Sequence, residues 1–423
     1  MRAIRAGTVA AIMLALAGCS AGQPSTTGVT ARLVAAPGDL KDVLTPAQVQ
    51  RAYGLLPLYQ KGIDGAGQTI VIVDPYGSPT IASDLRHFDA TFGLAGPPSF
   101  RVITPAGPVP ASRLAGYRLG VAFETTLDVE WAHVMAPKAS ILLVETPAAE
   151  VEGATGFPQI ARALTYVIRR HLGDVISMSL AATEETFSSS AQLLSFRAPF
   201  MLAAEPAYRI TLVAASGDWG ASGPTYSTKS YYSYPVVAWP ASDPLVTAVG
   251  GTQLDLSASG ARRSPDIAWF GSGGGYSSVF GKPAYQDKAV AGARRAIPDI
   301  SMDASCKSSV AIYAGFGGGR RHWSGICGTS LATPLFAGVI ALADQVAGHP
   351  LGLINPALYR MAAAHDRGIV DITAGGNSVT FKHGPTVSGY SARPGYDPVT
   401  GVGTVNARYF VPELAAACRP DRC

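Results

Sequence analysis

The chain has 423 residues, of which 15% are charged and 48% hydrophobic, and its 33 basic and 29 acidic side chains give a formal net charge of +4. A chain this apolar and this lightly charged buries a sizeable core, which excludes an intrinsically disordered protein. The near balance of charge leaves no electrostatic footprint for nucleic acid, and no apolar run reaches the length of a multi-span membrane protein's helices. Nucleic-acid-binding proteins, transporters and channels are therefore excluded.

The N-terminus has the pattern of an export signal. Arg2 and Arg5 precede an apolar run at 7–17, and small residues follow up to Cys19. This order predicts a secretory signal over residues 1–18 rather than a transmembrane helix. The Leu-Ala-Gly-Cys ending resembles the bacterial lipobox, which implies cleavage before Cys19 and a lipid anchor on it, at the cell envelope or outside the cell. The alternative is an ordinary signal peptide that contains a cysteine.

The cysteine count agrees with export. Once Cys19 is set aside as the lipid anchor, four of the five cysteines remain. Four thiols in an exported chain predict two disulfides, for which three connectivities are possible. We favour the local pairs Cys306–Cys327 and Cys418–Cys423. A zinc site is the alternative, but no short His/Cys cluster supports it.

The body of the chain predicts an α/β fold. Residues 19–40 are rich in Ser, Thr, Gly, Ala and Pro and suit a flexible tether. Beyond them, short continuous apolar runs, typical of strands buried on both faces, alternate with helix-like segments. We expect strands at 68–74, 140–145, 174–180 and 209–215, and helices near 80–93, 120–135, 157–171 and 190–204. Such alternation predicts a doubly wound, mostly parallel sheet with helices on both faces, in one large domain over 41–417 with a tail at 418–423.

The second predicted helix carries two acids one turn apart. Glu124 and Asp128 lie along the edge of its apolar stripe, so both face the same way and close to the core. Like charges at this spacing cost a helix about 0.2–0.5 kcal/mol, and burial raises the cost. The pair is either two surface acids that pair with unseen basic residues or a coupled pair in which one carboxylate is a base and the other orients it.

A serine precedes the most apolar predicted helix. Gly-Thr-Ser leads into a stretch that is apolar nearly all round up to Val346, so we expect Ser330 at the helix N-terminus. Free N–H groups and the helix dipole favour a developing negative charge there, although an N-cap is the ordinary role of such a serine. The pattern GTSxAxP resembles the nucleophile motif of the subtilisin-like superfamily. None of the seven histidines has the sequence context of a histidine base, and His133, the least implausible one, would point away from Glu124.

The whole body from about residue 44 onward resembles the sedolisin family of serine-carboxyl peptidases, in which a glutamate replaces the histidine. The resemblance rests on seven motifs in the expected order, namely DPYGSPTIASDLRHFDATFGL (74–94), ETTLDVEWAHVMAP (124–137), ASGDWGASG (215–223), PASDPLVTAVGGT (240–252), SGGGYSSVFGKPAYQ (272–286), IPDISMDA (297–304) and GTSLATPLFAG (328–338). It implies a subtilisin-like fold and a serine-type endopeptidase or tripeptidyl-peptidase that acts on proteins or peptides. We expect a monomer, and activity at acidic pH because a carboxylate base works best near its own pKa.

The resemblance also implies site residues. Ser330 would be the nucleophile, Glu124 the general base, Asp128 its partner, and Asp218 an acid in the oxyanion hole that must keep its proton to donate a hydrogen bond. Asp74, at the end of the first strand, would extend the hydrogen-bond chain behind the base or simply cap the strand. Only about 25 residues separate the lipid anchor from this body, so we expect a lipoprotein form without the family's usual long propeptide.

Two C-terminal segments, DIT and SARPGYDPVTGVG, resemble the halves of the sedolisin calcium site. The implied ligands of a single Ca²⁺ are the carboxylates of Asp371 and Asp397 with the main-chain oxygens of Ile372, Arg393 and Gly395. An Asp-capped turn without metal is the alternative. The alternative for the whole protein is a catalytically silent surface lipoprotein that binds peptides.

Overall fold

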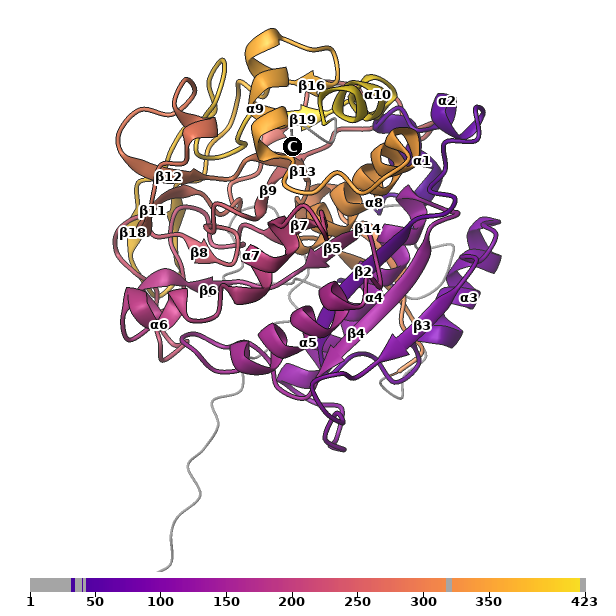
Figure 1. Cartoon of the computed structure of the whole chain (residues 1–423), viewed down its shortest axis with the longest axis horizontal. Coiled ribbons are helices and arrows are strands. Elements are labelled where there is room, and N and C mark those ends of the chain that lie inside the picture. The colour runs from indigo at the N-terminus through magenta and orange to yellow at the C-terminus, as the bar shows by residue number, and fades with distance from the viewer. Residues whose placement is uncertain (1–31, 35–39, 41–42, 317–321, 419–423) are drawn as a thin grey trace, which may run out of the picture.

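A computed structural model describes residues 32–34, 40, 43–316 and 322–418 (Figure 1). The expected signal, Cys19 and Cys423 lie outside these residues. Within the expected tether, β1 (Arg32–Val34) pairs antiparallel with β15 (Trp323–Ile326).

A sheet of eight strands forms the centre of the molecule, and its neighbouring strands run parallel except for β10. β13 (Ile300–Asp303) lies beside β9, off the main order. The other strands lie side by side in the order β10 (Ile267–Ala268), β9 (Thr247–Gln253), β7 (Thr211–Ala215), β5 (Val175–Met178), β2 (Thr69–Pro75), β4 (Ser140–Thr146) and β3 (Phe100–Ile103).

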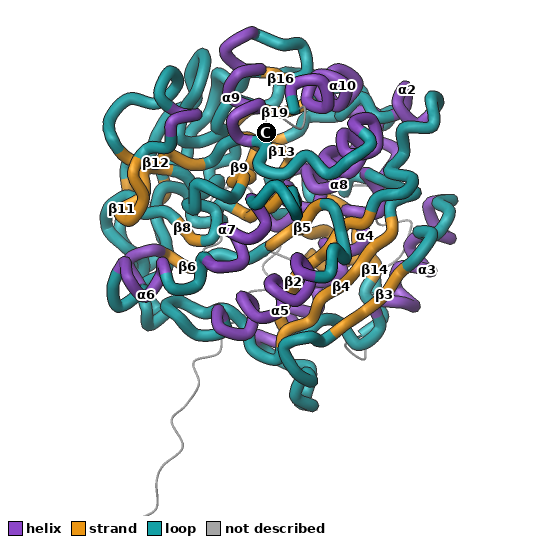
Figure 2. Tube along the Cα trace, viewed as in Figure 1, coloured by secondary structure: helices purple, strands orange, loops and turns teal. Residues whose placement is uncertain are grey.

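Helices cover both faces of this sheet (Figures 1 and 2). Successive residues of β2 show why: Ile70 and Ile72 point into one core and Val71 and Val73 into another, so both faces of the strand are apolar and buried. The first core lies under α3 (Ile81–Phe92), α4 (Tyr117–Met135) and α8 (Thr329–Ala347), and the second under α5 (Phe157–Arg169) and α7 (Ala198–Ala204). The predicted doubly wound α/β fold is confirmed.

Smaller elements surround this layered centre, and loops dominate the side around β11 and β12 (Figure 2). The remaining helices are α1 (Pro46–Ala52), α2 (Leu56–Tyr59), α6 (Ser190–Leu194), α9 (Asn355–Ala364) and α10 (Ala407–Ala417). The remaining strands are β6 (Ala182–Thr183), β8 (Ala238–Trp239), β11 (Gly275–Gly281), β12 (Arg294–Ile297), β14 (Val310–Tyr313), β16 (Ile369–Val370), β17 (Val379–Thr380), β18 (Thr386–Val387) and β19 (Thr404–Val405).

The central helix α8 packs closely against α4. A Cβ atom on Gly338 would stand 2.4 Å from the Cβ of Met135, so only glycine permits this approach of the two helices. By length and composition α8 could cross a membrane, which differs from our expectation that no apolar run is long enough, but 83% of its apolar window is buried inside the domain. It is a core helix, and it holds Ser330 in its first turn.

One predicted disulfide joins Cys306 to Cys327 across 21 residues and is confirmed. Cys418 is also disulfide-bonded, but its expected partner Cys423 lies outside the described residues.

Candidate active site

Three elements bring the predicted catalytic residues to the carboxyl edge of the parallel strands. Glu124 and Asp128 come from α4, Ser330 from the first turn of α8, and Asp218 from the loop after β7. Glu124 and Ser330 are each 7% exposed and Asp128 is fully buried, so the site is almost dry. Asp74, near the end of β2, is fully buried beside them.

Asp74, Glu124 and Asp128 lie close enough for the charge of one to raise the pKa of another. Burial raises the pKa of Asp74 to about 7, and the Glu145 charge adds to the rise while the Thr125 hydroxyl opposes it. Burial, followed by the charges of Asp74 and Glu124, raises the pKa of Asp128 well above its usual range. Among the described residues, no donor makes a hydrogen bond of good geometry to either carboxylate oxygen of Asp74 or to either one of Asp128. Adjacent carboxylates in so apolar a site share protons instead of all ionising.

The Ser330 hydroxyl faces the Glu124 carboxylate. Burial raises the pKa of Glu124 well above its usual range, the nearby Ser330 hydroxyl opposes this rise, and the charges of Asp74 and Asp218 add to it. The approach of the hydroxyl falls short of full hydrogen-bond geometry. Catalytic hydrogen bonds are often loose before substrate binds, so this pair has the arrangement of a nucleophile and its base.

Asp218 is tied to the start of the same helix. Its Oδ1 accepts hydrogen bonds from the Thr329 N–H at 2.7 Å and from the Thr329 hydroxyl at 2.8 Å. Its Oδ2 lies 2.7 Å from where a Cβ of Gly328 would stand, and Gly328 has φ 125°, so glycine is required beside it. Burial raises the pKa of Asp218 to about 6, against the two Thr329 hydrogen bonds. A carboxyl group that keeps its proton below about pH 6 can donate a hydrogen bond there.

Sequence reasoning missed two residues that lie beside these side chains, Ser179 and Glu150. The Ser179 hydroxyl, just beyond β5, donates to the Ser330 carbonyl at 3.3 Å and opposes the raised pKa of Asp128. Glu150, in the loop between β4 and α5, adds its charge near Glu124, and burial raises its own pKa to about 8. Ser179 lies at the end of a predicted strand, which is a position where functional side chains gather, whereas nothing in the sequence marks Glu150.

The histidine on the same helix as Glu124 is held by other partners. His133 lies on α4 but its Nε2 is 3.3 Å from an Asp89 carboxylate oxygen and 3.0 Å from the Ala95 carbonyl oxygen. It therefore points toward α3 and away from Glu124, as expected.

The two predicted calcium loops lie against each other. The Gly395 N–H donates to Asp371 Oδ2 at 2.8 Å, and the Arg393 N–H donates to Asp397 Oδ2 at 3.2 Å. Both Asp397 oxygens also accept hydrogen bonds from the turn that follows, as an Asp-capped turn requires. Among the described residues no backbone N–H donates to the main-chain oxygens of Ile372, Arg393 or Gly395. These three oxygens and the two carboxylates fit the donor set that Ca²⁺ prefers.

A family model and solved structures resemble this chain. The subtilase (peptidase S8) family model matches residues 115–363. Sedolisin of Pseudomonas, a serine-carboxyl proteinase solved with two molecules of pseudo-iodotyrostatin, superimposes with a TM-score of 0.73 at 25% identity, over 89% of this chain and 99% of that one. A lanthipeptide protease at 13% identity, with a TM-score of 0.51, shares the fold alone.

Two peptidases are similar to this chain over most of its length. Kumamolisin of Bacillus sp. strain MN-32 is 30% identical over 376 residues, which cover 85% of this chain and 61% of kumamolisin. Tripeptidyl-peptidase 1 of Canis lupus familiaris is 31% identical over 354 residues, which cover 80% of this chain and 58% of that enzyme. The chain thus spans about three fifths of the length of these relatives. It belongs to the subtilase family, within the sedolisin-type serine-carboxyl peptidases.

Proposed function

We propose that the chain hydrolyses peptide bonds of proteins or peptides through an acyl-enzyme on Ser330. The Ser330 oxygen attacks the substrate carbonyl carbon while Glu124 takes the hydroxyl proton, with Asp128 and Asp74 behind it sharing protons among the buried carboxylates. Glu124 then returns the proton to the leaving amine, and the C–N bond breaks. Water hydrolyses the ester by the same steps in reverse, which restores the free serine.

Asp218 is proposed to stabilise the tetrahedral oxyanion together with the Ser330 N–H. That N–H lies in the first turn of α8, where no carbonyl of the preceding turn is available to it. The Asp218 carboxyl donates through Oδ2, because Oδ1 already accepts both Thr329 hydrogen bonds. Donors that point at the developing charge in a dry site supply a large part of the rate acceleration of such enzymes.

We propose an acidic pH range for the activity. The reaction needs Asp218 protonated, and its pKa of about 6 means that the proton is lost as the pH rises past 6. It also needs Glu124 ionised, which sets the acid limb of the profile. A pH profile that peaks above about pH 8 would contradict this mechanism.

A single observation carries the proposal: Ser330, at the N-terminus of the core helix α8, turns its hydroxyl toward the buried Glu124 of α4. The test is cleavage of a denatured protein between about pH 3 and 7, with Ser330→Ala as the matched variant. Cleavage lost only in the variant supports the peptidase. Equal inactivity of both proteins would support the silent peptide-binding lipoprotein.

We propose one structural Ca²⁺, held by the carboxylates of Asp371 and Asp397 and the main-chain oxygens of Ile372, Arg393 and Gly395. When bound, the ion would neutralise the two carboxylates and join the two loops. Chelation should therefore lower the thermal unfolding temperature by several degrees, and added Ca²⁺ should restore it. An unchanged unfolding temperature would favour the Asp-capped turn.

Export and lipid anchoring at Cys19 are part of the proposal, and the N-terminal sequence pattern supports them. A protein of this kind would act at the cell envelope or outside the cell as a monomer. Cells fed radiolabelled fatty acid should incorporate label into the wild type and not into Cys19→Ser. Absence of label from the wild type would leave an ordinary signal peptide as the explanation.

A further inference from the structure

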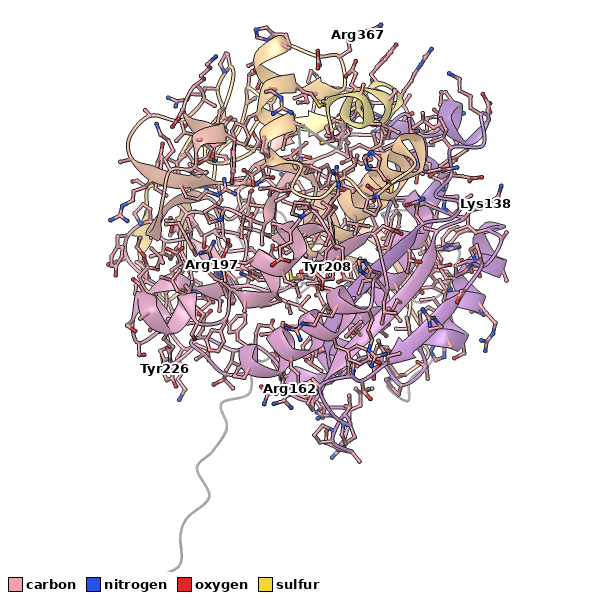
Figure 3. The ribbon with its side chains drawn as sticks, viewed as in Figure 1. Lys138, Arg162, Arg197, Tyr208, Tyr226 and Arg367 are labelled. Carbon is pink, nitrogen blue, oxygen red and sulfur yellow. A yellow bond between two sulfur atoms is a disulfide. The ribbon has the colours of Figure 1, made fainter. Side chains whose placement is uncertain are left out.

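A groove of about 510 Å³ lies on the outer surface between α5 and α7, away from the catalytic residues. Three arginines line it, namely Arg162, Arg169 and Arg170, and all three are exposed. Figure 3 shows Arg162 at the edge of the molecule, pointing outward. The spacing of the helix explains this stripe: positions 162, 166 and 169 share one face of α5, while the opposite face packs on the sheet.

No acidic side chain offsets the positive charge of the arginines in this groove. No Asp or Glu lines it, and within the described part of the chain these three arginines make no ion pair. Arg170 lies over the ring of Tyr166, 4.6 Å from its centroid, so the ring holds the guanidinium at the groove. Three unpaired guanidinium groups around one concave surface favour an anionic partner that offers several phosphate groups.

The segments that line the groove also carry exposed apolar side chains. Leu194 directly precedes the groove-lining Ser195 in sequence and is 41% exposed. Met201 lies one helical turn after the groove-lining Ala198 on α7 and is 51% exposed, and the groove-lining Tyr166 is 38% exposed. A soluble polyanion gains nothing from exposed aliphatic side chains. A lipid surface does, because its headgroups pair with arginine while its acyl boundary accepts leucine and methionine.

We infer that the face formed by α5 and α7 docks on an anionic phospholipid membrane surface, with Arg162, Arg169 and Arg170 against the lipid phosphates and Leu194 and Met201 at the acyl boundary. None of these residues is among the proposed catalytic residues Glu124, Asp128, Asp218 and Ser330. The inference agrees with a lipid anchor at Cys19, but it requires neither that anchor nor the peptidase chemistry.

The test uses the full chain with Cys19→Ser, so that no acyl anchor forms and the N-terminal segment is identical in every variant. Binding is measured on vesicles that contain phosphatidylglycerol and on vesicles of phosphatidylcholine alone, at low and high salt. A basic side chain near an anionic leaflet strengthens binding about fivefold. Arg162→Gln, Arg169→Gln and Arg170→Gln together should therefore weaken binding to the anionic vesicles on the order of 100-fold.

The matched control removes the same charge elsewhere, with Lys61→Gln, Arg86→Gln and Arg101→Gln, which are exposed positions outside the groove. This variant should bind within about threefold of the parent, because only charges near the leaflet contribute. Equal affinity of the two triple variants, or equal binding to vesicles without phosphatidylglycerol, would overturn the inference. If the triple groove variant unfolds at a lower temperature than the parent, the single variant Arg162→Gln replaces it, and its affinity for the anionic vesicles should fall about fivefold.

A second pair of measurements separates a membrane from another polyanion. Leu194→Ser with Met201→Ser should weaken binding to the anionic vesicles and leave binding to heparin unchanged. Unchanged vesicle binding in this variant, with heparin bound as tightly as vesicles, would show a general polyanion site and overturn the membrane assignment.

Discussion

Replacing the proposed oxyanion acid by its amide, Asp218→Asn, should remove the alkaline limb of the pH profile. The asparagine carbonyl can take the place of Oδ1 and accept both Thr329 hydrogen bonds, and its NH₂ then stands where Oδ2 lies, beside Gly328. An amide donates at every pH, whereas a carboxyl group donates only while protonated. The substitution thus keeps the donor and removes its titration.

The pKa of Asp218 sets the size of the effect. At a pKa of about 6, Asp218 is protonated in about 90% of the molecules at pH 5 and in about 1% at pH 8. Through this group alone, the wild-type kcat/KM should fall about 90-fold over that interval. Asp218→Asn should stay within roughly tenfold of the wild type at pH 5 and show no such fall, while Asp218→Ala should lose about 10²–10³-fold at pH 5.

The assay is kcat/KM on a soluble peptide substrate, measured from about pH 3 to 8 for the three proteins. Thermal unfolding at each pH excludes loss of the fold as the cause. The same alkaline limb in Asp218→Asn as in the wild type, or full activity in Asp218→Ala, would refute the oxyanion role.

Three further results are expected. Glu124→Gln should lower kcat by about 10²–10⁴-fold without loss of fold, since it removes the base and keeps the shape, and wild-type activity in that variant would contradict the role. Replacing Cys306 and Cys327 by serine should lower the free energy of unfolding by about 2–4 kcal/mol in denaturant titrations, because the bond closes a 21-residue separation; an unchanged midpoint would count against it. Finally, the folded pKa of Asp74, about 7, exceeds its unfolded value of 3.8, so the folded state binds more protons in that interval. Unfolding free energy of the inactive Ser330→Ala protein should therefore fall as the pH rises from about 4 to 7, and a rise over this range would contradict the burial of these carboxylates.

The strands that the sequence predicts are those whose burial is continuous. β2 and β4 are long apolar runs, so their pattern is unambiguous. β3 lies at the sheet edge with half-exposed side chains, and β9 contains Gly250 and Gly251, which weaken a strand signal. The predicted helix at 190–204 divides into α6 and α7, because Pro199 is tolerated in the first turn of a helix and starts the second one.

The local part of the site is also readable from sequence. Helical spacing places Glu124 and Asp128 on one face, and the apolar stretch after Gly-Thr-Ser places Ser330 at a helix start, as observed. Contacts between distant segments are not readable in this way. Ser179 reaches Ser330 across 151 residues, and Glu150 approaches Glu124 only because the loop after β4 returns to the sheet edge.

The most direct test of the central claim is detection of the acyl-enzyme. Wild type and Ser330→Ala are mixed with a peptide substrate, quenched in acid within the first turnover, and analysed by mass spectrometry of their proteolytic fragments. The account predicts the acyl part of the substrate attached to the fragment that contains Ser330 in the wild type, and no adduct or cleavage in the variant. Cleavage that persists in Ser330→Ala, or an adduct on another residue, would contradict it.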